Sequence, residues 1–189
     1  MLGWLVANSC ELPRRDRAIV TLAGIAPDVD GLGIIADFFW PDPATPHRWW
    51  IDFHHVLAHN ALAALLVSLV ALAIGRRRWI TAALAAVSFH LHLLCDLLGS
   101  GGPDGELWGI RYFWPWAATP FWTWSHQWRL DSWQNLLITL IAIIATGWLA
   151  IRRGYSPVGL FHPGLDQKVV ATLRRWRLRV HLSPRAVPT

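Results

Sequence analysis

The sequence predicts an all-α integral membrane protein, a bundle of three to four spanning helices followed by a basic amphipathic C-terminal tail. Of the 189 residues, 54% are hydrophobic and only 15% are charged, a composition too apolar for an ordinary soluble domain. Four long apolar stretches precede residue 155, and arginines stand beside them. The chain also has 14 tryptophans, a residue enriched where indole rings lie at the membrane–water boundary.

The first apolar stretch, residues 18–40, is the least regular of the four. Pro27, Asp28, Asp30 and Asp37 interrupt it. A charged side chain at membrane depth costs about 2.5–3.5 kcal/mol on insertion scales and therefore needs a partner or a purpose. This stretch is accordingly a weak candidate for a spanning helix.

The three later stretches, residues 56–74, 79–98 and 133–151, are predicted to be spanning helices. Each contains about 20 residues with few charges. At 1.5 Å rise per residue, each reaches about 30 Å, which is the thickness of the hydrocarbon core. The prediction of a helical bundle rests mainly on these three stretches.

The arginines predict an orientation, because they cluster before the first stretch, between the second and third, and after the fourth. Under the positive-inside rule both termini are cytoplasmic, and the connections at residues 41–53 and 99–132 face outward. We divide the chain into a membrane-embedded domain, residues 1–155, and a basic cytoplasmic tail, residues 156–189. Within the tail, residues 169–180 mix apolar residues with arginines, as in a helix that lies on a membrane surface.

The formal net charge of +5 has two interpretations. A basic chain can bind nucleic acid, but arginines beside apolar segments also serve as topology signals and contact anionic lipid. We favour the second interpretation and expect no nucleic-acid partner.

One helix of the predicted bundle carries ionisable side chains. His92 and Asp96 are four residues apart, so they share a face of the helix predicted at 79–98. His90 lies on a different face and is assigned to packing or to contacts around the site. By itself the pair His92 and Asp96 is also compatible with a buried hydrogen bond between two helices.

Two other segments carry residues of the same chemical types. His54, His55 and His59 stand at the start of the 56–74 stretch, and if the helix begins near His55, either of the first two can chelate an ion together with His59. Asp28 and Asp30 follow a proline. One of these aspartates is explained as a helix cap, whereas the second has no obvious structural role.

Together these segments predict a metal site near the outer face of the membrane. Carboxylates and imidazoles without thiolates suit Zn²⁺ first, and also Mn²⁺ or Fe²⁺. A metal ion with an open position acidifies a bound water, which can then attack an ester or phosphoester. Asp30, Asp96 or Asp104 is predicted to take the proton. The candidate ligands are Asp28, Asp30, His54, His55, His59, His92 and Asp96.

The order and spacing of these motifs resemble those of the predicted membrane-bound metal-dependent hydrolases, which include LexA-binding hydrolases associated with the inner membrane. The matching segments are Pro-Asp-Val-Asp at 27–30, His-His-Val-Leu-Ala-His-Asn at 54–60, His-Leu-Leu-Cys-Asp at 92–96 and Trp-Pro at 114–115. The resemblance implies hydrolase activity, a bacterial inner membrane location, and metal roles for Asp28, Asp30, His54, His59, His92 and Asp96. The family usually has a histidine near its N-terminus, and none precedes Leu2-Gly3-Trp4 here.

The predicted function is hydrolysis of an ester or phosphoester in a membrane lipid or a lipid-linked small molecule, since the site opens at membrane level. Arg111 or Arg129 is predicted to stabilise the negative charge that develops. One alternative is a metal or proton translocation protein, which predicts ionisable residues spread along the membrane normal. The other is a non-catalytic membrane scaffold or regulator, in which the aspartates and histidines only pair helices.

Overall fold

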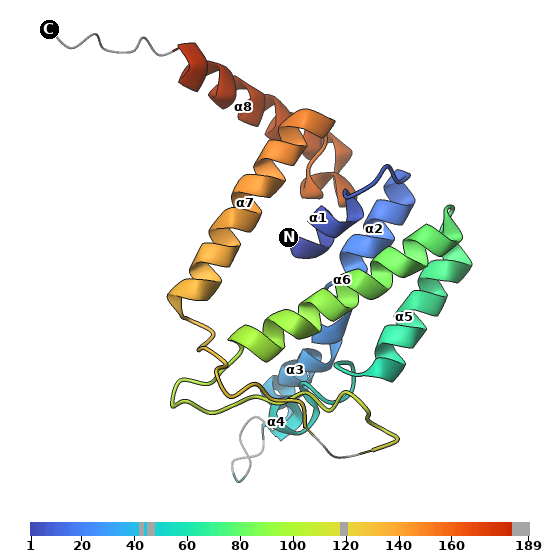
Figure 1. Ribbon diagram of the computed structural model, residues 1–189, viewed down its shortest axis with the longest axis vertical. Coiled ribbons are helices and arrows are strands. Elements are labelled where there is room, and N and C mark those ends of the chain that lie inside the picture. The colour runs from blue at the N-terminus through green and yellow to red at the C-terminus, as the bar shows by residue number, and fades with distance from the viewer. Residues whose placement is uncertain (42–43, 45–47, 118–120, 183–189) are drawn as a thin grey trace, which may run out of the picture. The chain divides into compact units, whose positions relative to one another are not determined.

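The computed structural model describes residues 1–41, 44, 48–117 and 121–182, and the regular secondary structure of this part of the chain is helical (Figure 1). The only β-pairing among the described residues is two isolated bridges, Gly101 with Arg129 and Ile110 with Trp122. The all-α class predicted from the sequence is therefore confirmed. The chain separates into two compact units, residues 2–139 and the part from Leu140 onward.

The first unit is built around one long helix, α6 (Arg78–Gly99). Helices α1, α2 and α5 and the 3₁₀ helix η1 all pack against it. Figure 1 shows α5 and α6 lying side by side. The other helices of this unit are α1 (Leu2–Ala7), α2 (Arg14–Ala23), η1 (Ala26–Leu32), α3 (Gly33–Phe39), α4 (Arg48–Phe53) and α5 (Ala61–Ile74), and α7 (Trp133–Arg153) begins in it.

The second unit contains the rest of α7, the 3₁₀ helix η2 (Pro157–Leu160) and α8 (Pro163–Leu182). Asp166 in the first turn of α8 accepts hydrogen bonds from the backbone N–H and the hydroxyl of Ser156, at 2.7 and 2.6 Å. Helix α8, the helix of the predicted basic tail, has 20 residues and is longer than the predicted 169–180. Its cytoplasmic location and the domain boundary after residue 155 stay predictions.

Two or three segments are long and apolar enough to cross a membrane. Helices α6 and α7 meet this requirement singly, and the pair Arg14–Ala23 and Ala26–Phe39 meets it together with a bend of 52°. Helix α5 has only 14 residues, which gives about 21 Å against the roughly 30 Å of a hydrocarbon core. The predicted three to four spans are therefore confirmed only in part, and the predicted 56–74 helix is too long.

Helix α5 begins late because two residues interrupt the chain before it. His55 has a φ of 65°, which a right-handed helix does not allow. Asn60 is the N-cap, and its side chain accepts the N–H of Ala63 at 2.9 Å. Residues 54–60 therefore form a turn, and the condition for a helical chelate of His55 with His59 is not met.

Helices α1, α2 and α6 approach one another closely through small residues. A β-carbon at Gly24 would lie 2.6 Å from Ser88 Oγ and 3.3 Å from the Cα of Gly3. One at Gly3 would lie 2.8 Å from the same hydroxyl. Glycine and serine at such contacts are typical of membrane helix packing. The contact brings the end of α2, and hence η1, onto α6.

The irregular segment 100–132 is anchored on the C-terminal end of α6. The Gln127 side chain donates to the carbonyl oxygens of Asp96 and Trp108, at 2.8 and 3.1 Å, and accepts the N–H of Trp108 at 2.8 Å. Asn135 donates to the carbonyl of Gly99 at 2.7 Å. These contacts satisfy carbonyl groups that the helix end leaves free and hold Trp108 near Asp96.

Candidate metal centre

The two aspartates of the Pro-Asp-Val-Asp motif point in different directions, because η1 is a 3₁₀ helix. At three residues per turn, positions two apart are separated by about 240°. Asp28 Oδ1 lies 3.3 Å from His92 Nε2, whereas Asp30 contacts His54 and His59. The two aspartates of the motif therefore contact different histidines of one cluster.

Asp30 is a fully buried acceptor whose two oxygens are both engaged. Its Oδ1 accepts from His54 Nδ1 at 3.0 Å, and its Oδ2 accepts from His59 Nδ1 at 2.9 Å and from the Ala58 N–H at 3.0 Å. A carboxylate acceptor assigns the proton of each ring to Nδ1, which leaves the Nε2 lone pair free. Carboxylates hold metal-binding histidines in this way.

His92 has the same tautomer for a different reason. Its Nδ1 lies 2.9 Å from the carbonyl oxygen of Gly24, and a carbonyl only accepts, so Nδ1 carries the proton. The Nε2 lone pair then faces Asp96 Oδ2 at 3.1 Å and Asp28 Oδ1 at 3.3 Å. The helix packing at Gly24 therefore orients this imidazole.

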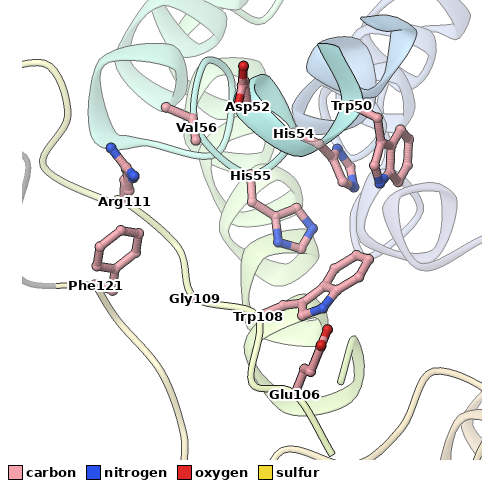
Figure 2. A pocket seen from close by; sticks show the side chains of 10 residues that line it. All are labelled: Trp50, Asp52, His54, His55, Val56, Glu106, Trp108, Gly109, Arg111 and Phe121. Atoms are coloured by element: carbon pink, nitrogen blue, oxygen red, sulfur yellow. The ribbon is translucent and has the colours of Figure 1, made fainter. Parts of the chain in front are cut away.

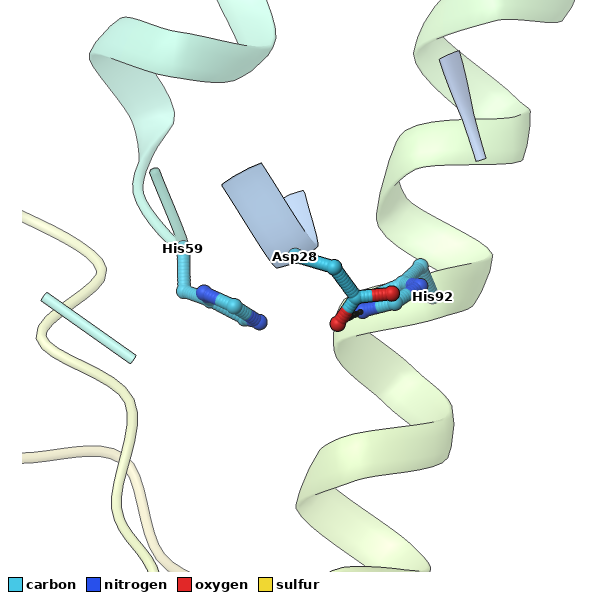
Figure 3. A group of neighbouring side chains, drawn as sticks. All are labelled: Asp28, His59 and His92. Carbon is cyan, nitrogen blue, oxygen red and sulfur yellow. Dashed lines mark ion pairs between the residues drawn. The ribbon is translucent and has the colours of Figure 1, made fainter. Parts of the chain in front are cut away.

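Three buried acceptor atoms converge at this point. His59 Nε2 lies 3.3 Å from Asp96 Oδ2, and neither these atoms nor His92 Nε2 has a hydrogen-bond partner in the described part of the chain. Figure 3 shows the His59 ring pointing toward Asp28 and His92. Ligands at 2.0–2.1 Å from a tetrahedral zinc ion are about 3.3 Å apart, which matches the observed separations.

The residues within reach of one ion form three overlapping groups in the described chain, each with ligand atoms no more than 4.8 Å apart. His59, which is completely buried, belongs to all three. The sequence left open whether His54 or His55 ligates, and the structure places His55 with Asp96 and His54 with Asp30. The groups are Asp28, His59 and His92; Asp30, His54 and His59; and His55, His59 and Asp96. All seven predicted ligands are among them.

His55 is held in the neutral form that binds metals. Burial lowers the pKa of its imidazole to about 4. Its ring centroid lies 4.5 Å from that of His59 and 4.3 Å from that of His54. A neutral imidazole needs to release no proton when it ligates.

A pocket of about 570 Å³ borders the cluster at His54 and His55 (Figure 2). The predicted base Asp104 is exposed, outside the three ligand groups found in the described chain. Glu106, which the sequence patterns did not single out, lines the pocket instead. Arg111 also lines it.

Two residues considered in the sequence, His90 and Arg129, have other contacts. His90 donates from Nδ1 to the Ala86 carbonyl at 2.8 Å, and its Nε2 lies 2.9 Å from the Tyr112 hydroxyl. Arg129 is exposed and pairs with Asp131 at 2.8 Å. His90, as expected from its helix face, is outside the three ligand groups of the described residues.

The apolar helices and the carboxylate–imidazole cluster define a helical membrane protein with residues that could hold a metal ion. A model of the YdjM inner membrane protein family matches residues 1–166, and the chain belongs to that family. No curated protein and no solved structure matches the chain. The membrane part of the resemblance is thereby confirmed, and hydrolase activity stays a prediction.

Proposed function

We propose that the chain is a metal-dependent hydrolase that binds a divalent cation, zinc first and manganese or iron second. The observation that carries this proposal is the convergence of three buried acceptor atoms. His59 Nε2 lies 3.3 Å from Asp96 Oδ2, and His92 Nε2 lies 3.1 Å from the same oxygen. Buried acceptors that face one another without a proton between them are costly. A cation removes that cost by binding all three.

The proposed ligands are His59, His92 and Asp96, with Asp28 as the fourth and His55 at the pocket side. Asp28 has 53% of its side chain exposed, so the site is open to solvent on that side, as a catalytic zinc site requires. Asp30 accepts three hydrogen bonds and acts here as a positioning residue that holds the imidazole rings.

A divalent ion held in this cluster would acidify a bound water and so supply the nucleophile for hydrolysis of an ester or phosphoester. Water adds to the acyl carbon or phosphorus, the bond to the alcohol oxygen breaks, and the alcohol leaves with a proton from the water. Glu106, on the wall of the adjacent pocket, takes the place of the exposed Asp104 as proton acceptor. The arginine distribution supports a site toward the outer face, where lipid or lipid-linked substrates reach it.

The test is elemental analysis of the full chain, purified in detergent and reconstituted with zinc, together with hydrolysis of carboxylic and phosphoric esters. We expect about one ion per chain and an activity that a chelator removes and zinc restores. His92→Gln removes both. His90→Gln, two residues away on the same helix and bonded to Tyr112, keeps both.

A wild-type chain without metal, or a His92→Gln chain with the wild-type metal content, contradicts the proposal. Either result would favour the scaffold alternative, in which protonated histidines form ion pairs with the aspartates. Bound metal without hydrolysis, accompanied by ion flux across reconstituted vesicles, would favour translocation.

A further inference from the structure

An extended segment around Ile110 separates two pockets. Ile110 and Trp122 exchange backbone hydrogen bonds in both directions at 2.9 Å. Successive side chains of an extended chain face opposite sides, and accordingly Ile110 and Tyr112 line an apolar pocket of about 340 Å³. Arg111 lines the polar pocket that borders the histidines. Two residues of the cluster and Arg111 therefore share one cavity.

Among the described residues that line this pocket, Arg111 is the only arginine or lysine. Its guanidinium carbon lies 4.5 Å from the centre of the Phe121 ring, a cation–π contact that orients the group. Its Nε is buried and has no hydrogen-bond partner within the described residues. A buried guanidinium N–H without an acceptor is costly, so the side chain is suited to an acceptor brought by a ligand.

Two acidic residues, Asp52 and Glu106, also line the pocket, and they lie apart from each other. Figure 2 shows Arg111 and Phe121 on one side and Glu106 beneath Trp108 on the other, with His55 between them. Arg111 and Glu106 thus lie on either side of an imidazole of the cluster, that of His55. An anionic group placed between Arg111 and His55 would contact the guanidinium and stay clear of Glu106.

We propose that Arg111 is the anchor for the phosphate group of the substrate, and that the substrate is a phosphate ester. This inference rests on the proposed hydrolase function. A planar guanidinium matches two phosphate oxygens at once, whereas an uncharged carboxylic ester offers it no charge. In the reaction, the water oxygen bonds to phosphorus, the bond from phosphorus to the alcohol oxygen breaks, and the alcohol takes a proton. Phosphate remains at Arg111.

The test compares the zinc-reconstituted full chain with Arg111→Gln, Arg111→Lys and the control Arg152→Gln. Arg152 also lies over an aromatic ring, Trp148, at 4.0 Å, but it is far along the sequence from the pocket residues. Binding of inorganic phosphate is measured by calorimetry. We expect Arg111→Gln to weaken binding about 10- to 100-fold, Arg111→Lys to weaken it less, and Arg152→Gln to leave it unchanged.

Kinetics give a second readout. For p-nitrophenyl phosphate, Arg111→Gln should raise KM about tenfold or more, with zinc content unchanged as evidence that the chain is folded. For the neutral p-nitrophenyl acetate, KM should stay within about twofold. Phosphatidic acid in mixed micelles, tested beside the soluble ester, shows whether the phosphate belongs to a lipid headgroup or to a soluble compound; Arg111 should matter for whichever is hydrolysed.

Equal phosphate affinity in wild type and Arg111→Gln overturns the inference, as does an equal loss of activity on the neutral and the charged ester. The two proposals fail separately. If the chain proves metal-free and inactive, phosphate binding in the presence of chelator still tests Arg111, and a loss in Arg111→Gln alone upholds the anion site. If hydrolysis of neutral esters persists without any effect of Arg111, the hydrolase stands and the phosphate assignment falls.

Discussion

A carboxylate lies near each end of α6, and the two have opposite surroundings; the Asp96 side chain is 20% exposed, with its Oδ2 buried. At the N-terminal end, Asp16 is completely buried and accepts from the N–H groups of Arg76 and Arg77 at 2.9 and 2.8 Å and from the Thr81 hydroxyl at 2.9 Å. At the C-terminal end, Asp96 Oδ2 meets only the Nε2 atoms of histidines, at 3.1 and 3.3 Å.

The two carboxylates differ in whether neighbouring groups donate hydrogen bonds to their oxygens. Burial of a carboxylate is tolerated when each oxygen accepts a proton from a neighbour, and Asp16 meets this condition through the turn between α5 and α6. Asp96 meets it only through doubly protonated imidazoles, because the neutral rings of His59 and His92 have their proton on Nδ1. The first arrangement is a structural clamp, and the second is the arrangement that the proposed cation would complete.

The largest expected effect comes from breaking the clamp. Asp16→Ala leaves two backbone N–H groups and the Thr81 hydroxyl without their acceptor, which we expect to cost about 3–5 kcal/mol. Thermal unfolding in detergent measures the loss, and Thr81→Val should cost about 1 kcal/mol by comparison. Wild-type stability of Asp16→Ala would show that Asp16 is no clamp.

The corresponding substitution near the C-terminal end of α6 is made at Asp96, and its main effect is expected on zinc binding. Asp96→Asn should weaken zinc binding at least about 100-fold, measured by competition with a chelator. The stability of the metal-free chain should change by less than about 1 kcal/mol, because the new amide can donate to an imidazole lone pair. If instead the metal-free chain lost stability while zinc affinity stayed intact, Asp96 would be a structural residue like Asp16.

A smaller effect on zinc is expected from Asp30, which touches the imidazoles on their far side. Asp30→Asn replaces one acceptor oxygen by a donor, so the Nδ1–H groups of His54 and His59 no longer both have a partner. We expect zinc affinity to fall about 10- to 100-fold. A larger loss than in Asp96→Asn would show that Asp30 is itself a ligand.

The smallest effect concerns the helix contact that orients His92. Gly24→Ala places a methyl group 2.6 Å from Ser88 Oγ, which should cost about 1–3 kcal/mol of stability. The control is Gly147→Ala, where nothing lies within 4 Å of the added carbon and helix propensity should raise stability by up to about 1 kcal/mol. Equal effects of both changes would exclude close packing at Gly24.

Features that depend on neighbours along the chain could be predicted from the sequence. His92 and Asp96 are one turn apart within a long apolar run, and they do share a face of α6 with their side chains 3.1 Å apart. The set of residue types that could ligate was also visible, because ionisable groups in apolar stretches need partners. The late start of α5 was missed, since the left-handed His55 and the Asn60 cap interrupt a stretch that is apolar in composition.

Features that depend on distant partners could not be predicted. Asp16 and Thr81 are 65 positions apart, and no local pattern marks the aspartate as a buried clamp. The same holds for Glu106, which reaches the pocket because the segment after α6 is anchored there by Gln127. Arg111, by contrast, was one of two arginines that were predicted for the site from the sequence. The different orientations of Asp28 and Asp30 followed from the 3₁₀ geometry of η1, which the sequence did not predict.

The sequence by itself determined the helical membrane class and the chemical types of the candidate ligand residues, because apolar content and local spacing suffice for both. The tertiary structure decided which oxygen and nitrogen atoms meet, and which of these atoms have a proton between them. These pairings depend on contacts among three elements: η1, the turn that precedes α5, and helix α6. Such contacts exist only once the chain has packed.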